Sequence, residues 1–100
     1  MIQFIATDIY SDWYSALRDV QARARINARL RRAELGNFGD CQPIGEGVPE
    51  MRIHYGPGYR VYWMKKRQEI FILLAGGDKS SQTKDIKVAL QLARSIKGAT

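Results

Sequence analysis

With 100 residues, of which 45% are hydrophobic, the chain can build one hydrophobic core but not two, and we expect a single domain over residues 1–100. Its formal net charge of +6 predicts a surface that attracts polyanions, of which nucleic acid is the commonest inside cells. The single cysteine, Cys41, excludes an intrachain disulfide, and no apolar run is long enough for a membrane span, so we expect a cytoplasmic protein.

The N-terminal part predicts a strand followed by a helix. Ile2 and Phe4 belong to a short apolar segment that stops at Thr7 and Asp8, residue types suited to capping a helix N-terminus. Apolar residues then recur at spacings of three and four and form one helical face, which consists of Ile9, Trp13, Ala16, Leu17 and Val20.

A second helical pattern runs from about residue 20 to residue 35. Its apolar side consists of Ala22, Ile26, Leu30 and Ala33. Gly36 then supplies the signal for a helix C-cap. Residues 37–49 are rich in glycine and proline and have little periodicity, which predicts a surface loop.

The middle of the chain predicts an antiparallel meander. Apolar and polar residues alternate from Pro49 until Gly56-Pro57-Gly58 enforces a turn. Residues 59–64 form the return strand, residues 65–68 the next turn, and residues 69–75 a nearly continuous apolar strand. The glycines of the GEG, GPG and AGG strings are interpreted as turn formers.

A final helix follows, which Ser80 or Ser81 can cap. Its apolar face consists of Ile86, Ala89, Leu90, Ala93 and Ile96. The predicted fold class is therefore α+β, with an N-terminal strand and helical hairpin packed on an antiparallel sheet and a C-terminal helix that closes it.

A hairpin centred on Pro57 would place His54 opposite Arg60, and Arg52 opposite Tyr62. These four side chains would share one face of the sheet. The other face would be the core side, formed by Met51, Ile53, Tyr55, Tyr59, Val61 and Trp63.

This grouping matches the needs of metal-independent RNA cleavage, in which the 2′-hydroxyl attacks the adjacent phosphate. Arg52 and Arg60 would neutralise the phosphorane, and Lys79 could reach the same phosphate. His54 could transfer a proton, while Tyr62 could stack on a base or assist. The same pattern is also typical of ordinary solvated residues on an open sheet face.

A second basic feature follows one helical stripe and consists of Arg18, Arg25, Arg29 and Arg32. Such a stripe can track the phosphate backbone of RNA, although it is also typical of a solvated helix face paired with Asp19 or Glu34. The sequence has no Cys/His cluster for zinc, no GxxxxGK[ST] phosphate loop and no GxSxG elbow. It suggests no metal and no organic cofactor.

Three segments, RLRRAELGNFGD, GEGVPEMRIHYGPGYRVYW and ILLAGGDKSSQTKDI, resemble those of HigB-like addiction module killer proteins in the RelE/ParE toxin superfamily. They occur in order and span nearly the whole chain. The resemblance implies a RelE-like microbial RNase fold and a type II toxin that cuts mRNA, commonly in the ribosomal A site. Among the candidate residues it implies functional roles for Arg52, Arg60 and Lys79.

The chain departs from the RelE pattern because no tyrosine or histidine follows Tyr62. Either His54 or Tyr62 fills the acid/base role, or proton transfer rests on lysine and arginine while the ribosome aligns the substrate.

The expected partners are mRNA, the ribosome with its RNA, and a cognate antitoxin of helix-turn-helix type, for which an acidic segment would be electrostatically suited. Two other functions remain open: a ParE-like inhibitor of DNA gyrase, and an RNA-binding module without catalysis.

Overall fold

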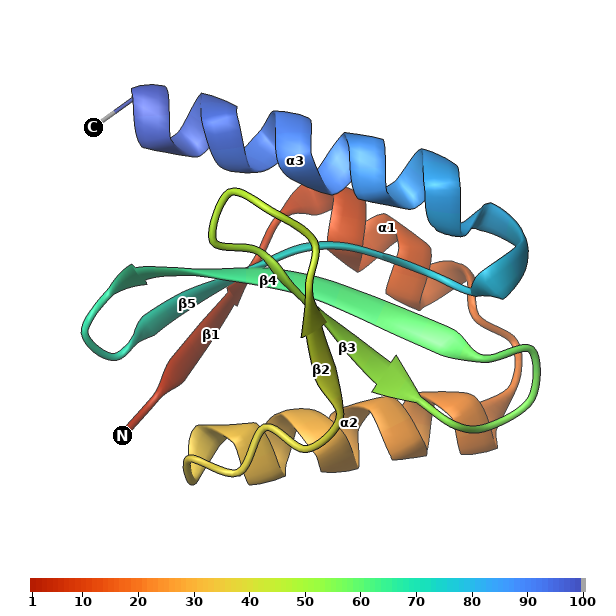
Figure 1. Ribbon diagram of the computed structural model, residues 1–100. Helices are drawn as coiled ribbons and strands as arrows, with labels where there is room; N and C mark the ends of the chain where they lie inside the picture. Colours follow the sequence, from red (N-terminus) through yellow and green to blue (C-terminus); the bar gives the residue numbers. More distant parts are fainter. Residues whose placement is uncertain (100) are drawn as a thin grey trace.

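The computed structural model describes residues 1–99 and shows an α+β fold, in which a mixed sheet lies between helices (Figure 1). The strands are β1 Gln3–Ala6, β2 Cys41–Pro43, β3 Pro49–Ile53, β4 Tyr59–Arg67 and β5 Ile70–Gly77. The helices are α1 Asp8–Ala16, α2 Val20–Glu34 and α3 Gln82–Gly98, with a short 3₁₀ turn, η1, at Lys79–Ser81. This arrangement confirms the predicted class and the C-terminal helix.

The strand order is β1-β5-β4-β3-β2, and β1 pairs in parallel with β5, whereas all other neighbours are antiparallel. The prediction of a purely antiparallel sheet is therefore wrong at this edge. β1 and β5 can run parallel because the chain between them passes through helices and the rest of the sheet before it returns. β2 lies in the segment predicted as loop, and three paired residues were too few to show a periodicity.

Two of the predicted helix caps are present and one differs. Thr7 Oγ1 accepts from the amide of Tyr10 at the start of α1, and Gly36, at a φ of +93°, follows the end of α2. Ser81 occupies the N-cap position of α3, as predicted, but its side chain makes no capping hydrogen bond. Asp78 accepts from the amide of Ser80, and the hydroxyl of Ser81 donates to Asp85 instead.

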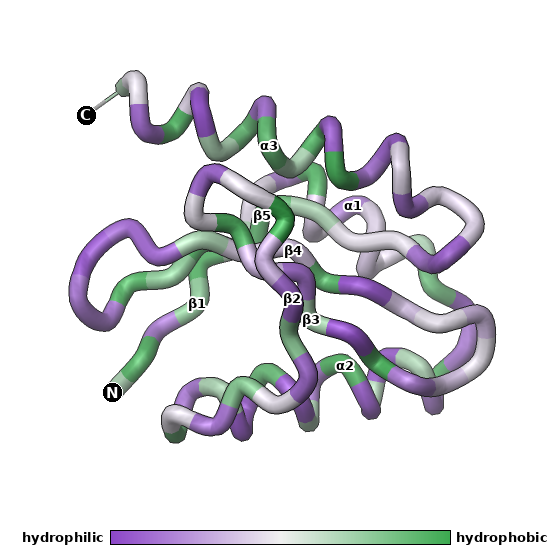
Figure 2. Tube along the Cα trace, in the orientation of Figure 1, coloured by the Kyte–Doolittle hydropathy of each residue, from purple (hydrophilic) through white to green (hydrophobic). Residues whose placement is uncertain are grey.

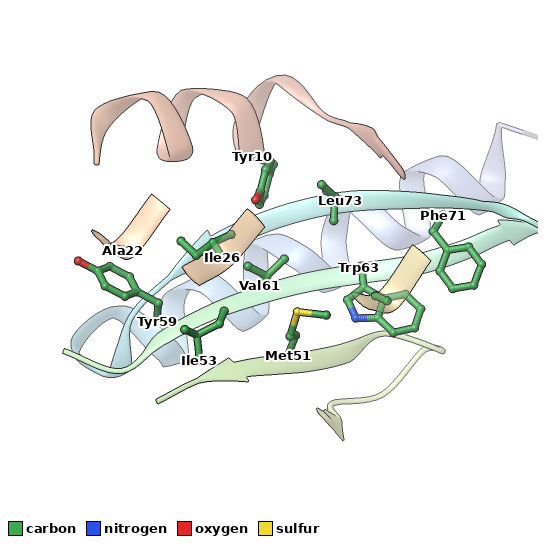
Figure 3. Packing of buried hydrophobic residues seen from close by; sticks show 11 residues of the cluster. Tyr10, Ala22, Ile26, Met51, Ile53, Tyr59, Val61, Trp63, Phe71 and Leu73 are labelled. Atoms are coloured by element: carbon green, nitrogen blue, oxygen red, sulfur yellow. The ribbon is translucent and has the colours of Figure 1, made fainter. Parts of the chain in front are cut away.

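Both faces of the sheet are covered. Tyr10 of α1 and Ile26 of α2 pack on the face formed by Met51, Val61 and Trp63 (Figure 3). α3 covers the opposite face, so that α2 and α3 lie on opposite sides of the sheet in Figure 1. Hydrophobic residues concentrate in the central strands, while the β4–β5 connection is hydrophilic (Figure 2). The face predicted to be open for chemistry therefore carries a helix.

Gly76 and Gly77 lie inside β5 rather than in a turn, which corrects the interpretation of the AGG string. A Cβ on Gly76 would lie 2.2 Å from the ring of Trp13 in α1, and a Cβ on Gly77 would lie 1.7 Å from Oδ2 of Asp85 in α3. Because neighbouring strand residues point to opposite faces, the two glycines admit one helix side chain on each face.

Candidate functional site

The register of β3 and β4 places Arg52 opposite Arg60, and Glu50 opposite Tyr62. The predicted pairs of His54 with Arg60 and of Arg52 with Tyr62 are therefore wrong by two residues. The loop comprises residues 54–58 and centres on Gly56 rather than on Pro57, because Ile53 and Tyr59 form the last pair. A shift of two residues preserves the face of every side chain, so Arg52, Arg60 and Tyr62 do share one face.

Glu50 is the centre of a hydrogen-bond network on this face, beneath α3. Its side chain is only 1% exposed and accepts from Arg52 Nε at 3.2 Å, from the Tyr62 hydroxyl at 2.8 Å and from Gln82 Nε2 at 2.9 Å. Arg52 and Tyr62 were candidates, but Glu50 and Gln82 were missed. One signal was present, since Glu50 lies two residues before Arg52 and must share its face.

The network controls the protonation of its members. Burial alone raises the pKa of Glu50, but hydrogen bonds from Gln82, Tyr62 and Arg52, with the charge of Arg60, hold that pKa below its ordinary value. Burial and the bond to Glu50 raise the pKa of Tyr62 far above its ordinary value. The Tyr62 side chain is also fully buried, so stacking on a base would require α3 to move.

Arg60 is the buried cation of this face. Its residue is 6% exposed, and within residues 1–99 its Nε has no hydrogen-bond partner. The negative charge of Glu50 is close enough to interact with it, but the two do not form an ion pair. Nε is shielded from solvent, so a ligand would meet this guanidinium through its terminal nitrogens, which donate no hydrogen bond within residues 1–99.

Lys79 lies at the same end of the sheet as Arg60. Arg60 pairs with Gly77, two residues before Lys79, and the amide of Lys79 donates to the carbonyl of Pro57 at 3.5 Å. A Cβ on Gly58 would lie 3.0 Å from Cγ and Cε of Lys79, so the lysine stem lies against the β3–β4 loop. The structure thus pairs Arg52 with Arg60 and places the stem of Lys79 at the same end of the sheet.

His54 lies outside the buried network beneath α3. It follows the last pair of β3, its side chain is 71% exposed, and its Nε2 lies 2.6 Å from Oδ2 of Asp40. This hydrogen bond lowers the pKa of Asp40. His54 lines a hollow of about 350 Å³ between α2 and β3, together with Arg25, Ala28, Arg29, Arg32 and Ile53.

The four arginines of the predicted stripe do not form one continuous surface. Arg18 lies in the connection between α1 and α2 and is not part of α2, contrary to the prediction of one helical stripe. Arg25 lies over the ring of Tyr55, 4.6 Å from its centroid. Arg29 donates to the carbonyls of Arg52, Phe38 and Asp40. Arg32 is exposed.

These contacts predict a structural role for Arg29. Arg29→Ala removes hydrogen bonds that tie α2 to β3 and to the segment before β2, and we expect it to lower the free energy of unfolding by about 2 kcal/mol. Arg32→Ala, which makes the same change one helical turn away, should stay within about 0.5 kcal/mol of wild type. Urea unfolding measures the stability of both variants. Equal stabilities of Arg29→Ala and Arg32→Ala would contradict a structural role for Arg29.

Over residues 1–99 no cluster of three or more His, Cys, Asp or Glu side chains is placed to hold a metal ion. None of the helices in this range is both long and apolar enough to cross a membrane.

The chain is similar to a protein of Haemophilus influenzae (strain ATCC 51907 / DSM 11121 / KW20 / Rd) that is described as "Uncharacterized protein". The two are 46% identical over 95 residues, which cover 95% of this chain and 96% of the relative. No protein-family model matches the chain.

Proposed function

We propose that this chain, which belongs to the same protein family as the Haemophilus influenzae relative, is the toxin of a type II toxin–antitoxin system. It has a RelE-like microbial RNase fold and acts as a ribosome-dependent endoribonuclease. The RNA 2′-hydroxyl attacks the adjacent phosphate, and cleavage of mRNA inhibits translation.

The state of Arg60 is the observation that carries this proposal. An arginine residue that is 94% buried and leaves Nε without a partner is costly to the fold, and an anion that binds its terminal nitrogens would offset part of that cost. Arg52 is its partner across the strands, and Lys79 lies at the same end of the sheet. Three cations around one position suit a phosphate whose charge increases in the transition state.

Glu50 fixes the direction of Arg52 in this mechanism. The carboxylate accepts from Nε, which leaves the two terminal nitrogens of Arg52 available for phosphate oxygens. Arg52 and Arg60 then stabilise the phosphorane from neighbouring strands, while the lysine adds a point charge.

Proton transfer is assigned to the cationic side chains and to the alignment of the RNA by the ribosome. Tyr62 stays protonated, and its hydroxyl donates a hydrogen bond to Glu50. His54 lies with Asp40 on the side of α2. Positioning of the 2′-hydroxyl in line with its phosphate supplies most of the rate acceleration in such a site.

The inhibitory partner is an antitoxin of helix-turn-helix type. A toxin with a net charge of +6 favours an acidic segment in this partner, because opposite potentials increase the rate of encounter. Covering Arg52 or Lys79 would suffice to exclude the phosphate.

Induction in a bacterial host tests the function, with mRNA 5′ ends mapped and protein and DNA synthesis followed together. Wild type should cut within translated codons and stop protein synthesis first. Arg52→Ala should reduce cleavage by about 100-fold, because it removes one donor to the phosphorane. Arg67→Ala is the matched control, since Arg67 is exposed at the other end of the neighbouring strand β4.

Three outcomes would contradict the proposal. Intact transcripts with an early arrest of DNA synthesis would identify a gyrase inhibitor. RNA binding without any cut product would identify a binding module without catalysis. Equal cleavage by Arg52→Ala and Arg67→Ala would show that the site lies elsewhere.

A further inference from the structure

We propose that the hollow between α2 and β3 is a second phosphate-binding site, which holds a backbone phosphate of RNA outside the cleavage site. The choice of RNA as the ligand rests on the proposed function. The hollow has a volume of about 350 Å³, which suits one phosphate with its ribose, and three of its six lining residues are arginines. Figure 1 shows β3 and the β3–β4 loop alongside α2.

The three arginines of the hollow have different tasks. Arg29 forms part of the wall, because its guanidinium is committed to backbone carbonyls. Within residues 1–99 neither Arg25 nor Arg32 donates a hydrogen bond to the protein, and both are exposed. These two guanidiniums are the expected ligands of the phosphate.

Arg25 is already held in place. It lies over the ring of Tyr55, and the Tyr55 hydroxyl donates to Asp19 at the N-terminus of α2 at 2.9 Å. An arginine stacked on an aromatic ring loses less conformational freedom when it binds an anion. The hollow therefore needs little rearrangement to accept a phosphate.

The charge balance also favours an anion. Arg25, Arg29 and Arg32 outnumber the two carboxylates beside them, which are Asp40, hydrogen-bonded to His54, and Asp19, whose charge interacts with Arg25. The hollow lies one residue along β3 from Arg52, since Ile53 lines it while Arg52 points to the α3 side. RNA bound at the cleavage site can therefore continue around the end of β3 into the hollow.

The test compares two double variants on the same helix with the same change in charge. Arg25→Ala/Arg32→Ala alters the hollow, whereas Arg23→Ala/Arg31→Ala removes two arginines that do not line it. The probe is a short 2′-O-methyl oligoribonucleotide, which cannot undergo attack by a 2′-hydroxyl. Fluorescence anisotropy over a range of salt concentrations gives the affinity and its salt dependence, and circular dichroism checks folding.

We expect the first variant to bind roughly tenfold more weakly at low salt. Its slope of log affinity against log salt should fall by about 0.7 for each RNA phosphate that the protein no longer neutralises. The control variant should bind almost like wild type. Equal losses of affinity in both variants, or no loss in either, would overturn the site.

A second measurement needs no variant. In wild type the Nε–H resonances of Arg25 and Arg32 should shift when the oligoribonucleotide is added, while those of Arg23 and Arg31 stay in place. Shifts caused by an acidic glutamate peptide but not by the RNA would overturn the proposal in favour of protein docking.

Failure of the second phosphate site can be told apart from failure of the proposed nuclease activity. Binding through the hollow without any cleavage by wild type would refute the nuclease and leave the second site standing. Cleavage with unchanged binding by Arg25→Ala/Arg32→Ala would refute the second site alone.

Discussion

Replacing Arg60 by methionine is expected to reduce RNA cleavage by at least about 100-fold, while the free energy of unfolding changes by no more than about 1 kcal/mol. The guanidinium is the most buried cation of the proposed site and would contact the phosphorane directly. Its removal breaks no hydrogen bond of Nε within residues 1–99, because Nε has no partner there. Methionine has a similar length and can fill the same space.

The contrast between the two effects separates function from stability. Replacing a structural arginine such as Arg29 should lower the stability of the protein, whereas replacing Arg60 should lower its activity at nearly constant stability. Cleavage of ribosome-bound mRNA and urea unfolding measure the two quantities on the same preparation. Arg67→Met makes the same change at an exposed position of β4 and should leave both unchanged. Cleavage by Arg60→Met at the wild-type rate would remove Arg60 from the site.

Glu50→Ala should have the largest effect on stability and lower the free energy of unfolding by about 3–5 kcal/mol. Removal of the carboxylate leaves the Tyr62 hydroxyl and the Gln82 amide without their acceptor beneath α3, and it releases Arg52. Buried donors without a charged acceptor incur their full desolvation cost. Urea unfolding measures the decrease.

Glu69→Ala is the control for this variant. Glu69 pairs with the N-terminal amine at 2.8 Å, but both groups are largely exposed, so we expect a change below about 1 kcal/mol. A decrease of the same size in both variants would show that burial of the Glu50 network contributes little.

The effect of Glu50 should also depend on pH. Its pKa in the folded protein lies below the ordinary value of 4.5, so its contribution to stability is complete above about pH 4.5 and is lost as the pH falls through the folded pKa. The difference in unfolding free energy between wild type and Glu50→Ala should therefore be constant near neutral pH and shrink in acid. A difference that does not change down to about pH 3 would contradict a role for the ionised carboxylate.

The helices and the central strands could be predicted because their signals are local. The apolar periodicity of α2 and α3 and the alternation along β3 and β4 depend only on residues a few positions apart. The alternation also assigned Arg52 and Arg60 correctly to one face, which a register error of two residues did not disturb. The short strand β2 and the parallel pairing of β1 gave no comparable signal.

The candidate site was only partly predictable. The resemblance pointed to Arg52, Arg60 and Lys79, and the alternation pointed separately to the two arginines, which the structure pairs across β3 and β4. Glu50 was overlooked because a glutamate in a short strand has no visible role until the helix that covers it is placed. The roles of these residues in cleavage remain predictions.

The sequence by itself determined which side chains share a face, because a strand repeats every two residues and a helix about every 3.6. Only the tertiary structure decided which residues lie opposite each other, which face α3 covers, and that His54 joins the arginines of α2 rather than Arg60. These outcomes depend on contacts between distant segments, such as Gln82 with Glu50 and Asp85 with Gly77. Such contacts leave no periodic trace in a single sequence, because each one depends on how whole elements pack.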